Sequence, residues 1–387
     1  MNILHITATY VPSTNGVAIT TQRTVSVLRA LGHTVWVIGP RYNHQEEKES
    51  YIPFPTIYHL PFIPRDYPLI VPYLSRKQTV LLMRIPWDII HVHHPFAVGA
   101  LARRIGSALD VPVVFTYHTQ YDQVARYFVP WLPKGIHRAL YTHGVLKVGK
   151  TMDHVIATTT WLAKTLQQRL PLVPISYVTT AGLPKPFLLP TKKRVLRQRL
   201  NLPLEYPIFL CVSRVSREKN VGFLIGAYRQ WLRGKKRGCF VVVGDGNDRT
   251  RLERYVRDIR LSGHVLFVGK IANDQLPAWY SAADIFLYSG IHDTIGVNVV
   301  EAMSAGLPVV AIDHVVSREI VRDDDNGVLA PEEARVFAKA MDRALVNHRK
   351  LTIGALKTVS DYTLSKTTGQ LLSVYNATID AHTRRHQ

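Results

Sequence analysis

Short apolar runs alternate along this chain with longer stretches whose apolar residues have helical spacing. In the first half the apolar runs occupy residues 3–8, 34–39, 89–92, 112–116 and 154–157. Residues 16–30, between the first two runs, have the spacing of a helix. Continuous β-branched runs separated by helices are typical of a parallel sheet that is covered on both faces. The first half is therefore expected to be an α/β domain.

The same alternation begins again in the second half. Apolar runs lie at residues 207–212, 239–244, 265–269, 285–288 and 308–311. Glycine and proline interrupt the periodicity at residues 181–186. The simplest interpretation is two successive Rossmann-like, doubly wound parallel-sheet domains, at residues 1–184 and 185–367. The basic stretch 192–199 is expected to begin the first helix of the second domain.

Two segments leave an alternative open. Residues 53–77 contain six prolines interleaved with Phe and Tyr, a density that excludes a regular helix. The segment is either an irregular packed loop or an apolar rim for a lipid-like acceptor or a membrane surface. Residues 131–150 can form a helix with basic residues beside an apolar face. That pattern fits an anionic lipid surface or an ordinary helix with a basic outer side.

The composition is that of a globular protein, and the length of 387 residues fits about two domains. Two cysteines, Cys211 and Cys239, exclude a disulfide scaffold and predict a reducing, cytoplasmic setting. No apolar run approaches the roughly 18 residues of a spanning helix. The first residues also lack the basic start and cleavage pattern of a signal peptide.

The charge balance is unusual, because 48 Lys and Arg residues face 28 Asp and Glu residues, giving a formal net charge of +20. Both halves share the excess. Such a charge favours an anionic partner, which can be nucleic acid, an anionic membrane or a phosphorylated substrate. The sequence contains no recognition helix, zinc pattern or RNA-binding aromatic signature. A nucleic-acid-binding protein is therefore a remote alternative.

Two acidic residues, Asp293 and Glu301, stand eight positions apart after an apolar run. Residues 294–297 are expected to open a helix that carries Glu301. Backbone N–H groups at the start of a helix attract phosphate oxygens. A carboxylate beside them can accept hydrogen bonds from sugar hydroxyls, as at the ribose of nucleotide sites.

Other candidate residues also follow predicted strands. Arg214 and Lys219 come after the run 207–212, where they can converge on a diphosphate. Gly244 ends the run 239–244 and begins a Gly-x-Gly turn, which a simple strand-to-helix turn is sufficient to explain. His118 follows the run 112–116, at the strand end where parallel sheets bind ligands. Gly16 permits close approach to the backbone where the first helix begins.

The segment 284–311 resembles the acidic-x7-acidic motif of retaining nucleotide-sugar glycosyltransferases of the two-Rossmann-domain type (GT-B, family 4). The Glu-Ala-Met-x-x-Gly-x-Pro-Val-Val that follows the motif is similar as well, although Asp293 stands where the family commonly has Glu. The pattern around residues 118–130 is most similar to the lipid-glycosylating branch, with diacylglycerol glucosyltransferases and phosphatidylinositol mannosyltransferases. The resemblance implies two Rossmann-like domains that face a cleft, with a last helix at about 368–387 packing back on the first.

The resemblance also implies roles for these residues. Glu301 would bind the nucleotide ribose, Asp293 would contact the donor sugar, and Arg214 and Lys219 would neutralise the leaving diphosphate. The implied donor-binding residues are Gly16, Arg214, Lys219, Gly244, Ile271, Asp293, Thr294, Ile295, Gly296, Val297 and Glu301. The implied catalytic residues are His118, Asp293, Arg214 and Lys219, and the implied acceptor-binding residues are Tyr121, Asp122, Arg126 and Tyr127.

The function implied is transfer of a hexose, by default glucose from UDP-glucose, to a membrane lipid such as diacylglycerol. A GDP-mannose donor and a soluble or phosphorylated acceptor stay open. The enzyme would be peripheral on the inner face of the cell membrane, bound to its anionic surface. No metal or other cofactor is expected, because His91, His93 and His94 have no acidic or Cys companion, and residues 323–327 are expected to be a turn.

Overall fold

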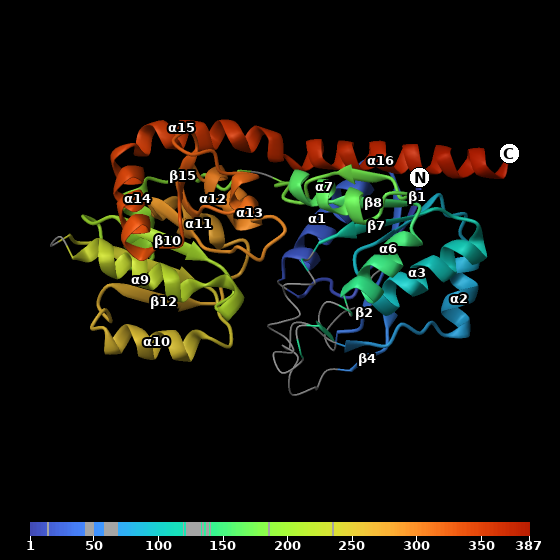
Figure 1. The fold of residues 1–387 in the computed structure, drawn as a ribbon, viewed down its shortest axis with the longest axis horizontal. Helices are drawn as coiled ribbons and strands as arrows, with labels where there is room; N and C mark the ends of the chain where they lie inside the picture. Colours follow the sequence, from blue (N-terminus) through green and yellow to red (C-terminus); the bar gives the residue numbers. More distant parts are fainter. Residues whose placement is uncertain are drawn as a thin grey trace. The chain divides into compact units, whose positions relative to one another are not determined.

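The computed structural model describes residues 1–13, 15–42, 50–57, 69–118, 120, 133, 135–136, 139, 141–184, 186–233 and 236–387. These residues form two compact units (Figure 1). The N-terminal unit comprises Met1–Pro184 and Leu364–Gln387, and the C-terminal unit comprises Lys185–Thr363. Each unit is built around one parallel sheet.

The N-terminal unit contains a seven-stranded sheet in the order β3-β2-β1-β6-β7-β8-β9. All of its neighbouring strands are parallel. The strands are β1 (Asn2–Ile6), β2 (Thr34–Pro40), β3 (Tyr51–Phe54), β6 (Ile89–Val92), β7 (Val113–Tyr117), β8 (His154–Ala157) and β9 (Ile175–Tyr177). A separate antiparallel pair consists of β4 (Thr56–Ile57) and β5 (Leu69–Ile70).

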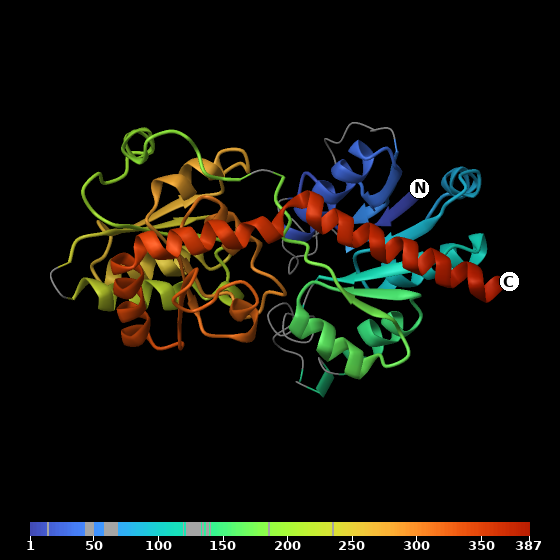
Figure 2. The ribbon, with the colours of Figure 1, turned by 90° about the horizontal axis from the view of Figure 1, so that it is seen from above.

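Helices cover both faces of this sheet. They are α1 (Gly16–Ala30), α2 (Arg76–Met83), α3 (Phe96–Leu109), η1 (Tyr141–Leu146, a π-helical turn), α6 (Lys147–Lys150), α7 (Thr160–Arg169) and α16 (Leu364–His386). Alternation along β1 places Leu4 and Ile6 in the core beneath α3 and α7, and Ile3 in the core beneath α1 and α16. Figure 2 shows α16 lying along this unit, where it contacts α1.

The C-terminal unit contains a six-stranded parallel sheet in the order β12-β11-β10-β13-β14-β15. Its strands are β10 (Ile208–Val212), β11 (Cys239–Val243), β12 (Val265–Gly269), β13 (Ile285–Tyr288), β14 (Val309–Ile312) and β15 (Gly327–Ala330). Its helices are α8 (Lys193–Arg199), η2 (Arg217–Lys219), α9 (Val221–Leu232), α10 (Arg249–Asp258), α11 (Leu276–Ala282), α12 (Val297–Ser304), α13 (Val315–Arg318), α14 (Ala334–Val346), α15 (His348–Val359) and η3 (Ser360–Tyr362).

A partly buried acid, Asp284, holds α8 to the sheet. The Asp284 carboxylate accepts hydrogen bonds from Arg197 Nη2 at 2.5 Å, Lys193 Nζ at 2.9 Å and the Ile208 backbone N–H at 2.7 Å. Burial raises the pKa of Asp284, but Lys193, the Ile208 N–H and Arg197 together lower it more, so the pKa lies below its ordinary value. Asp284 therefore stays ionised and links helix to strand.

The two predicted parallel sheets are confirmed, and helix α1 has the predicted bounds. The sequence analysis missed the edge strands β3, β9 and β15. Within residues 53–77, the described part contains short strand segments and the beginning of α2. Of the predicted helix 131–150, the described residues 141–150 are helical. In the described part of the chain, no helix has the length and apolar character that crossing a membrane requires.

Candidate active site

The carboxyl end of β10 carries the basic residues that the sequence predicted. Lys219 ends the short helix η2, and its Nζ forms an ion pair with Asp293 Oδ1. Arg214 lies before η2 and pairs with Glu218, its Nη2 being 2.8 Å from Oε1. The fold thus brings Lys219 and Asp293 together from positions 74 residues apart. Arg214 lies in the same connection between β10 and α9, where it forms an ion pair with Glu218.

Tyr288 is a residue of this site that the sequence analysis missed. It is the last residue of β13, and its hydroxyl lies 2.8 Å from Asp293 Oδ2 and 2.9 Å from the Gly290 carbonyl oxygen. Burial and the neighbouring Asp293 raise the pKa of Tyr288 well above its ordinary value, so the hydroxyl keeps its proton and donates. Asp293 is therefore held from two sides, by Tyr288 and by Lys219.

The backbone around the ion pair is fixed as well. Ser289 Oγ donates to the Lys219 carbonyl oxygen at 2.7 Å, which ties the end of β13 to η2. Asn298 Nδ2 donates to the Val212 carbonyl oxygen at 2.8 Å, which ties α12 to the end of β10. These links hold the connections that follow β10 and β13 in one arrangement.

The helix after Asp293 begins later than predicted. Thr294, Ile295 and Gly296 lie before it, and α12 begins at Val297. Tyr288 occupies the space beside Gly296, whose added Cβ would lie 3.1 Å from the Tyr288 hydroxyl. The backbone therefore turns closely around this tyrosine before it becomes helical.

Glu301 is buried on α12, although glutamates are mostly exposed in proteins. The Tyr280 hydroxyl, from α11, donates to Glu301 Oε2 at 3.1 Å. The sequence analysis missed Tyr280, because it lies 21 residues earlier on another helix. The carboxylate is thus oriented by the fold before any ligand binds.

Gly244 is required by the packing of the chain. Its φ is +134°, and an added Cβ would lie 1.9 Å from the Ser213 carbonyl oxygen. Its N–H donates to the Gly269 carbonyl oxygen at 2.8 Å, at the end of β12. The close backbone approach explains this glycine without a ligand. Ile271, two residues after β12, is partly exposed.

In the N-terminal unit, His118 lies one residue after β7 and is buried. Its Nε2 lies 2.9 Å from His93 Nδ1, and His93 Nε2 lies 2.8 Å from His5 Nδ1. His5, a polar residue between the apolar residues Leu4 and Ile6 of β1, was not predicted to belong to the site. The pairing of β1 with β6 places His5 opposite His91, so the two rings lie 5.0 Å apart.

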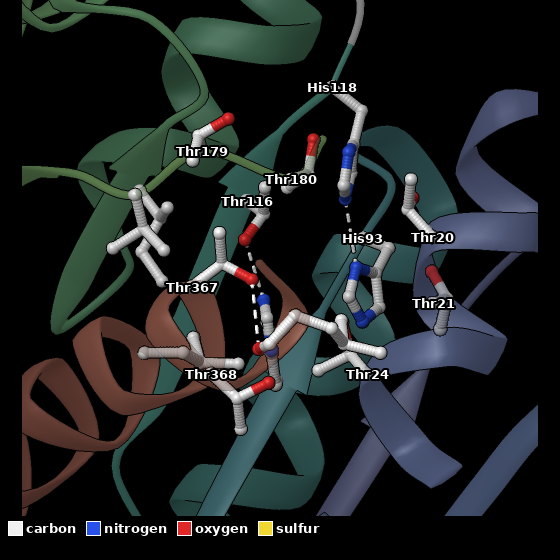
Figure 3. A pocket seen from close by; sticks show the side chains of 15 residues that line it. Thr20, Thr21, Thr24, His93, Thr116, His118, Thr179, Thr180, Thr367 and Thr368 are labelled. Carbon is white, nitrogen blue, oxygen red and sulfur yellow. Dashed lines mark hydrogen bonds between the residues drawn. The ribbon is translucent and has the colours of Figure 1, made fainter. Parts of the chain in front are cut away.

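His91 belongs to the same cluster but has its own partners. Its Nδ1 lies 2.5 Å from the Tyr375 hydroxyl of α16, and its Nε2 lies 2.6 Å from Thr116 Oγ1. A cavity of about 30 Å³ lies beside the cluster, with threonine side chains of α1 and α16 on its wall (Figure 3). The hydroxyls of Thr21 and Thr368 line it and have no hydrogen-bond partner among the described residues. The cavity therefore has the volume and the polar groups for water.

For some of the predicted site residues, the described structure shows no contact that supports a role. Gly16 is the first residue of α1, and an added Cβ would meet no atom within 4 Å, so no local packing demands glycine there. The predicted acceptor residues Tyr121, Asp122, Arg126 and Tyr127 lie outside the described residues. Within residues 323–327, Asp324 to Asn326 form the predicted turn and Gly327 begins β15. Within the part of the chain that the structure describes, His5, His91 and His93 are the group with metal-ligand spacing.

Comparison with known proteins extends over both units. The family model "Glycosyltransferase Family 4" matches residues 14–180, and "Glycosyl transferases group 1" matches residues 192–352. The alpha-monoglucosyldiacylglycerol synthase of Acholeplasma laidlawii is 26% identical over 333 residues, 82% of each chain. A GDP-mannose-dependent alpha-mannosyltransferase of Mycobacterium tuberculosis is 27% identical over 334 residues, 84% of this chain and 82% of that protein.

Solved structures show the same fold. Sucrose-phosphate synthase from Thermosynechococcus elongatus has a TM-score of 0.74 at 20% identity, covering 98% of this chain and 100% of that one. Anabaena HepE in complex with UDP and glucose has a TM-score of 0.74 at 17% identity, covering 97% and 100%. The resemblance found in the sequence is thereby confirmed: the chain is an enzyme that belongs to the GT-B glycosyltransferases of family 4.

Proposed function

We propose that the protein is a retaining glycosyltransferase that moves glucose from UDP-glucose onto the hydroxyl of a membrane lipid such as diacylglycerol. The observation that supports a lipid acceptor is a surface formed by α2 and the residues that flank it. Apolar and basic side chains are both exposed there. We call it the α2 surface. It consists of Val71, Tyr73, Arg76, Lys77, Val80, Leu81, Met83 and Arg84.

The apolar part of the α2 surface stands out in the described chain. Five of the fifteen large hydrophobic side chains that are exposed among the described residues lie within residues 71–83. Met83 is 65% exposed and Tyr73 is 61% exposed. Leu82 packs into the core of the unit, and Ser75 and Gln78 form a capping box, so the helix is fixed with the apolar residues outward. Exposed apolar patches of this kind mark interaction surfaces.

The basic part of the α2 surface selects an anionic partner. Arg76, Lys77 and Arg84 are exposed beside the apolar residues. Each basic residue near an anionic membrane contributes about 1 kcal/mol of attraction. The net charge of +20 acts in the same direction. Apolar side chains combined with basic ones fit a lipid interface, so we place the enzyme peripherally on the inner face of the cell membrane.

The C-terminal unit supplies groups for the donor. Lys219 and Arg214 would neutralise the diphosphate, whose negative charge grows as it leaves. Asp293 would accept hydrogen bonds from hydroxyls of the donor sugar, and Glu301 from those of the ribose. In this hypothesis the charge of the leaving group is carried by side chains and backbone amides, and no metal ion is needed.

The transfer itself is proposed to take place on one face of the sugar. The acceptor oxygen forms its bond to the anomeric carbon on the side from which the diphosphate departs. The departing phosphate accepts the hydroxyl proton, so the configuration at the anomeric carbon is retained. His118 would contact the donor sugar. Trapping of a covalent sugar on the protein would contradict this mechanism.

The experiment is nucleotide release from a panel of UDP- and GDP-sugars in excess chelator. It is run with and without anionic vesicles that contain diacylglycerol. We expect release from UDP-glucose that requires the vesicles. GDP-mannose is the second candidate donor, because a relative of similar identity is named for it. If the rate of nucleotide release does not change when vesicles are added, the lipid acceptor is wrong. If release requires a divalent ion, the metal-free mechanism is wrong.

A matched pair of variants tests the α2 surface. The triple change Val80→Ser, Leu81→Ser and Met83→Ser should reduce sedimentation with anionic vesicles at least tenfold. The control replaces three exposed apolar residues elsewhere, with Leu172→Ser, Val346→Ser and Ile353→Ser. The control should bind vesicles like the wild type. Equal binding by both triple variants would contradict the role of the α2 surface.

A further inference from the structure

Three buried histidines lie in a hydrogen-bonded row across the carboxyl ends of neighbouring strands. We call His5, His93 and His118 the histidine line. His5 Nδ1 lies 2.8 Å from His93 Nε2, and His93 Nδ1 lies 2.9 Å from His118 Nε2. The last of these contacts is drawn in Figure 3. The three residues lie on or directly after β1, β6 and β7, which are adjacent in the sheet, so strand pairing fixes the ring spacing.

All three rings are neutral at physiological pH. Burial, with a contribution from Arg29, lowers the pKa of His5 to about 3. Burial, with a contribution from His94, lowers the pKa of His118 to about 3. Burial and the surrounding histidines lower the pKa of His93 well below its ordinary value. A neutral imidazole has one N–H and one lone pair, so each ring donates at one nitrogen and accepts at the other.

Only two arrangements of protons satisfy both hydrogen bonds, because His93 uses both of its nitrogens. In the inward arrangement, His118 donates to His93, His93 donates to His5, and His5 Nε2 carries a proton. In the outward arrangement, His5 donates to His93, and His93 donates to His118. His118 then accepts at Nε2 and carries its own proton at Nδ1.

The His5 end of the row distinguishes these arrangements. His5 Nε2 is buried and has no hydrogen-bond partner in the part of the chain that the structure describes. The inward arrangement would leave an unmet N–H there, whereas the outward arrangement leaves an unmet lone pair. Among backbone groups, a buried N–H without an acceptor is rarer than an acceptor without a donor, and we apply the same order to this ring nitrogen.

We infer that the histidine line has the outward arrangement and holds His118 as a neutral hydrogen-bond donor with its proton on Nδ1. His5 and His93 are then positioning residues, which act on the donor through His118. The ligand group that fits Nδ1–H is an acceptor oxygen, such as a sugar hydroxyl or a phosphate oxygen. The inference deepens the proposed function, on which it rests for the role of His118 at the donor sugar.

A metal site is the other interpretation of this cluster. The candidate ligand atoms of His5, His91 and His93 lie within 4.8 Å of one another. Both nitrogens of His91 are engaged by Tyr375 and Thr116, and both nitrogens of His93 belong to the histidine line. A dication would break these hydrogen bonds and would be buried in a group with no acidic member. The observed bonds therefore favour the positioning role.

The test is the tautomer of His118 in the full-length protein without substrate. Long-range ¹H–¹⁵N spectra of ¹⁵N-histidine-labelled protein distinguish protonated from bare ring nitrogens. The variants His5→Asn, His93→Asn and His118→Asn assign the signals by loss. We expect a protonated Nδ1 and a bare Nε2 on His118, unchanged between pH 6 and pH 8. A proton on Nε2 of His118, or titration of its ring in that range, would overturn the inference.

Turnover measurements separate the inference from the proposed function. The His93→Leu and His93→Asn variants are matched in size, but only the asparagine side chain keeps a donor toward His118. We expect kcat/KM to be about tenfold lower in His93→Leu than in His93→Asn, with mixed tautomers of His118 in the leucine variant. Equal kcat/KM and an unchanged tautomer would refute the positioning role. Wild-type turnover by His118→Ala, with Nδ1–H observed in the wild type, would instead refute the role of His118 at the donor.

Discussion

Replacing Tyr288 by phenylalanine removes a single oxygen from the candidate active site. The Tyr288 hydroxyl lies 2.8 Å from Asp293 Oδ2 and 2.9 Å from the Gly290 carbonyl oxygen. The ring is 3% exposed, so water cannot easily replace the lost donor. Asp293 keeps its ion pair with Lys219 but loses the group that fixes its second oxygen.

The expected magnitude follows from this geometry. A hydrogen bond to a charged group contributes about 1.5–3 kcal/mol to stability. Because Lys219 still pairs with Asp293, we expect Tyr288→Phe to lower the free energy of unfolding by about 1.5 kcal/mol, near the lower limit. If Asp293 contacts the donor sugar, its carboxylate becomes more mobile in the variant and stabilises the transition state less. A loss of about 1.4 kcal/mol corresponds to a tenfold fall in kcat/KM.

The assay combines chemical unfolding with nucleotide release from the donor that the wild type uses. The control is Tyr228→Phe, another buried tyrosine of the same unit. The Tyr228 hydroxyl has no hydrogen-bond partner among the described residues, so its removal should be neutral or slightly stabilising. Tyr228 packs against Phe209 and Phe240 in the core, so kcat/KM should stay at the wild-type value.

Three results would refute the reasoning. Tyr288→Phe with unchanged stability would mean that its hydroxyl makes no net contribution to holding Asp293. Tyr288→Phe with the expected loss of stability but unchanged kcat/KM would mean that the orientation of Asp293 does not matter to the reaction. A similar loss in Tyr228→Phe would mean that the effect belongs to any buried tyrosine hydroxyl.

Three further predictions concern the same unit. Gly244→Ala should lower the free energy of unfolding by more than about 2 kcal/mol in chemical denaturation, because its Cβ would lie 1.9 Å from the Ser213 carbonyl oxygen at a φ of +134°. Asp284→Asn should lower it by about 3 kcal/mol at pH 7, because the buried guanidinium of Arg197 loses its charged partner. The pKa of Asp284 is lowered in the folded state, so unfolding curves of wild type and variant should converge as the pH falls from 3.8 through that lower pKa. Glu301→Gln keeps an acceptor for Tyr280 but loses the charge, so it should raise the KM for the nucleotide-sugar about tenfold in initial-rate assays, with kcat nearly unchanged.

The sequence predicted the strands well because a buried parallel strand is apolar on both faces. The residues 89–92, 154–157, 265–269 and 285–288 were predicted with the bounds that the structure has. The edge strands β3, β9 and β15 were missed because none of them contains more than two large apolar residues in a row, whereas the edge strand β12 contains four and was predicted. For example, β9 (Ile175–Tyr177) has three residues, none of them fully buried. Its position depends on pairing with β8, which a local apolar pattern does not contain.

Charged residues at strand ends were also predictable, whereas the groups that orient them were not. Lys219 and Asp293 stand out because each lies in the connection after an apolar strand, in a segment that resembles a family motif. Tyr288 and Tyr280 are ordinary core residues by sequence, since an aromatic ring on a strand or helix predicts packing. Their hydroxyls gain a role only when the fold places an acid within reach.

The role of the histidine line was even harder to predict from the sequence. His5 differs from its neighbours in an apolar strand, and this polarity was the available signal. Its meaning depends on strand order, because β1 and β7 both lie beside β6 although Ile6 and Val113 are 107 positions apart in the sequence. The hydrogen-bond sequence from His5 to His118 therefore exists only in the folded sheet. Strand pairing stabilises the sheet and also sets the spacing of the histidine rings. This spacing allows the hydrogen bonds between the rings, and these bonds determine which nitrogen of His118 carries the proton.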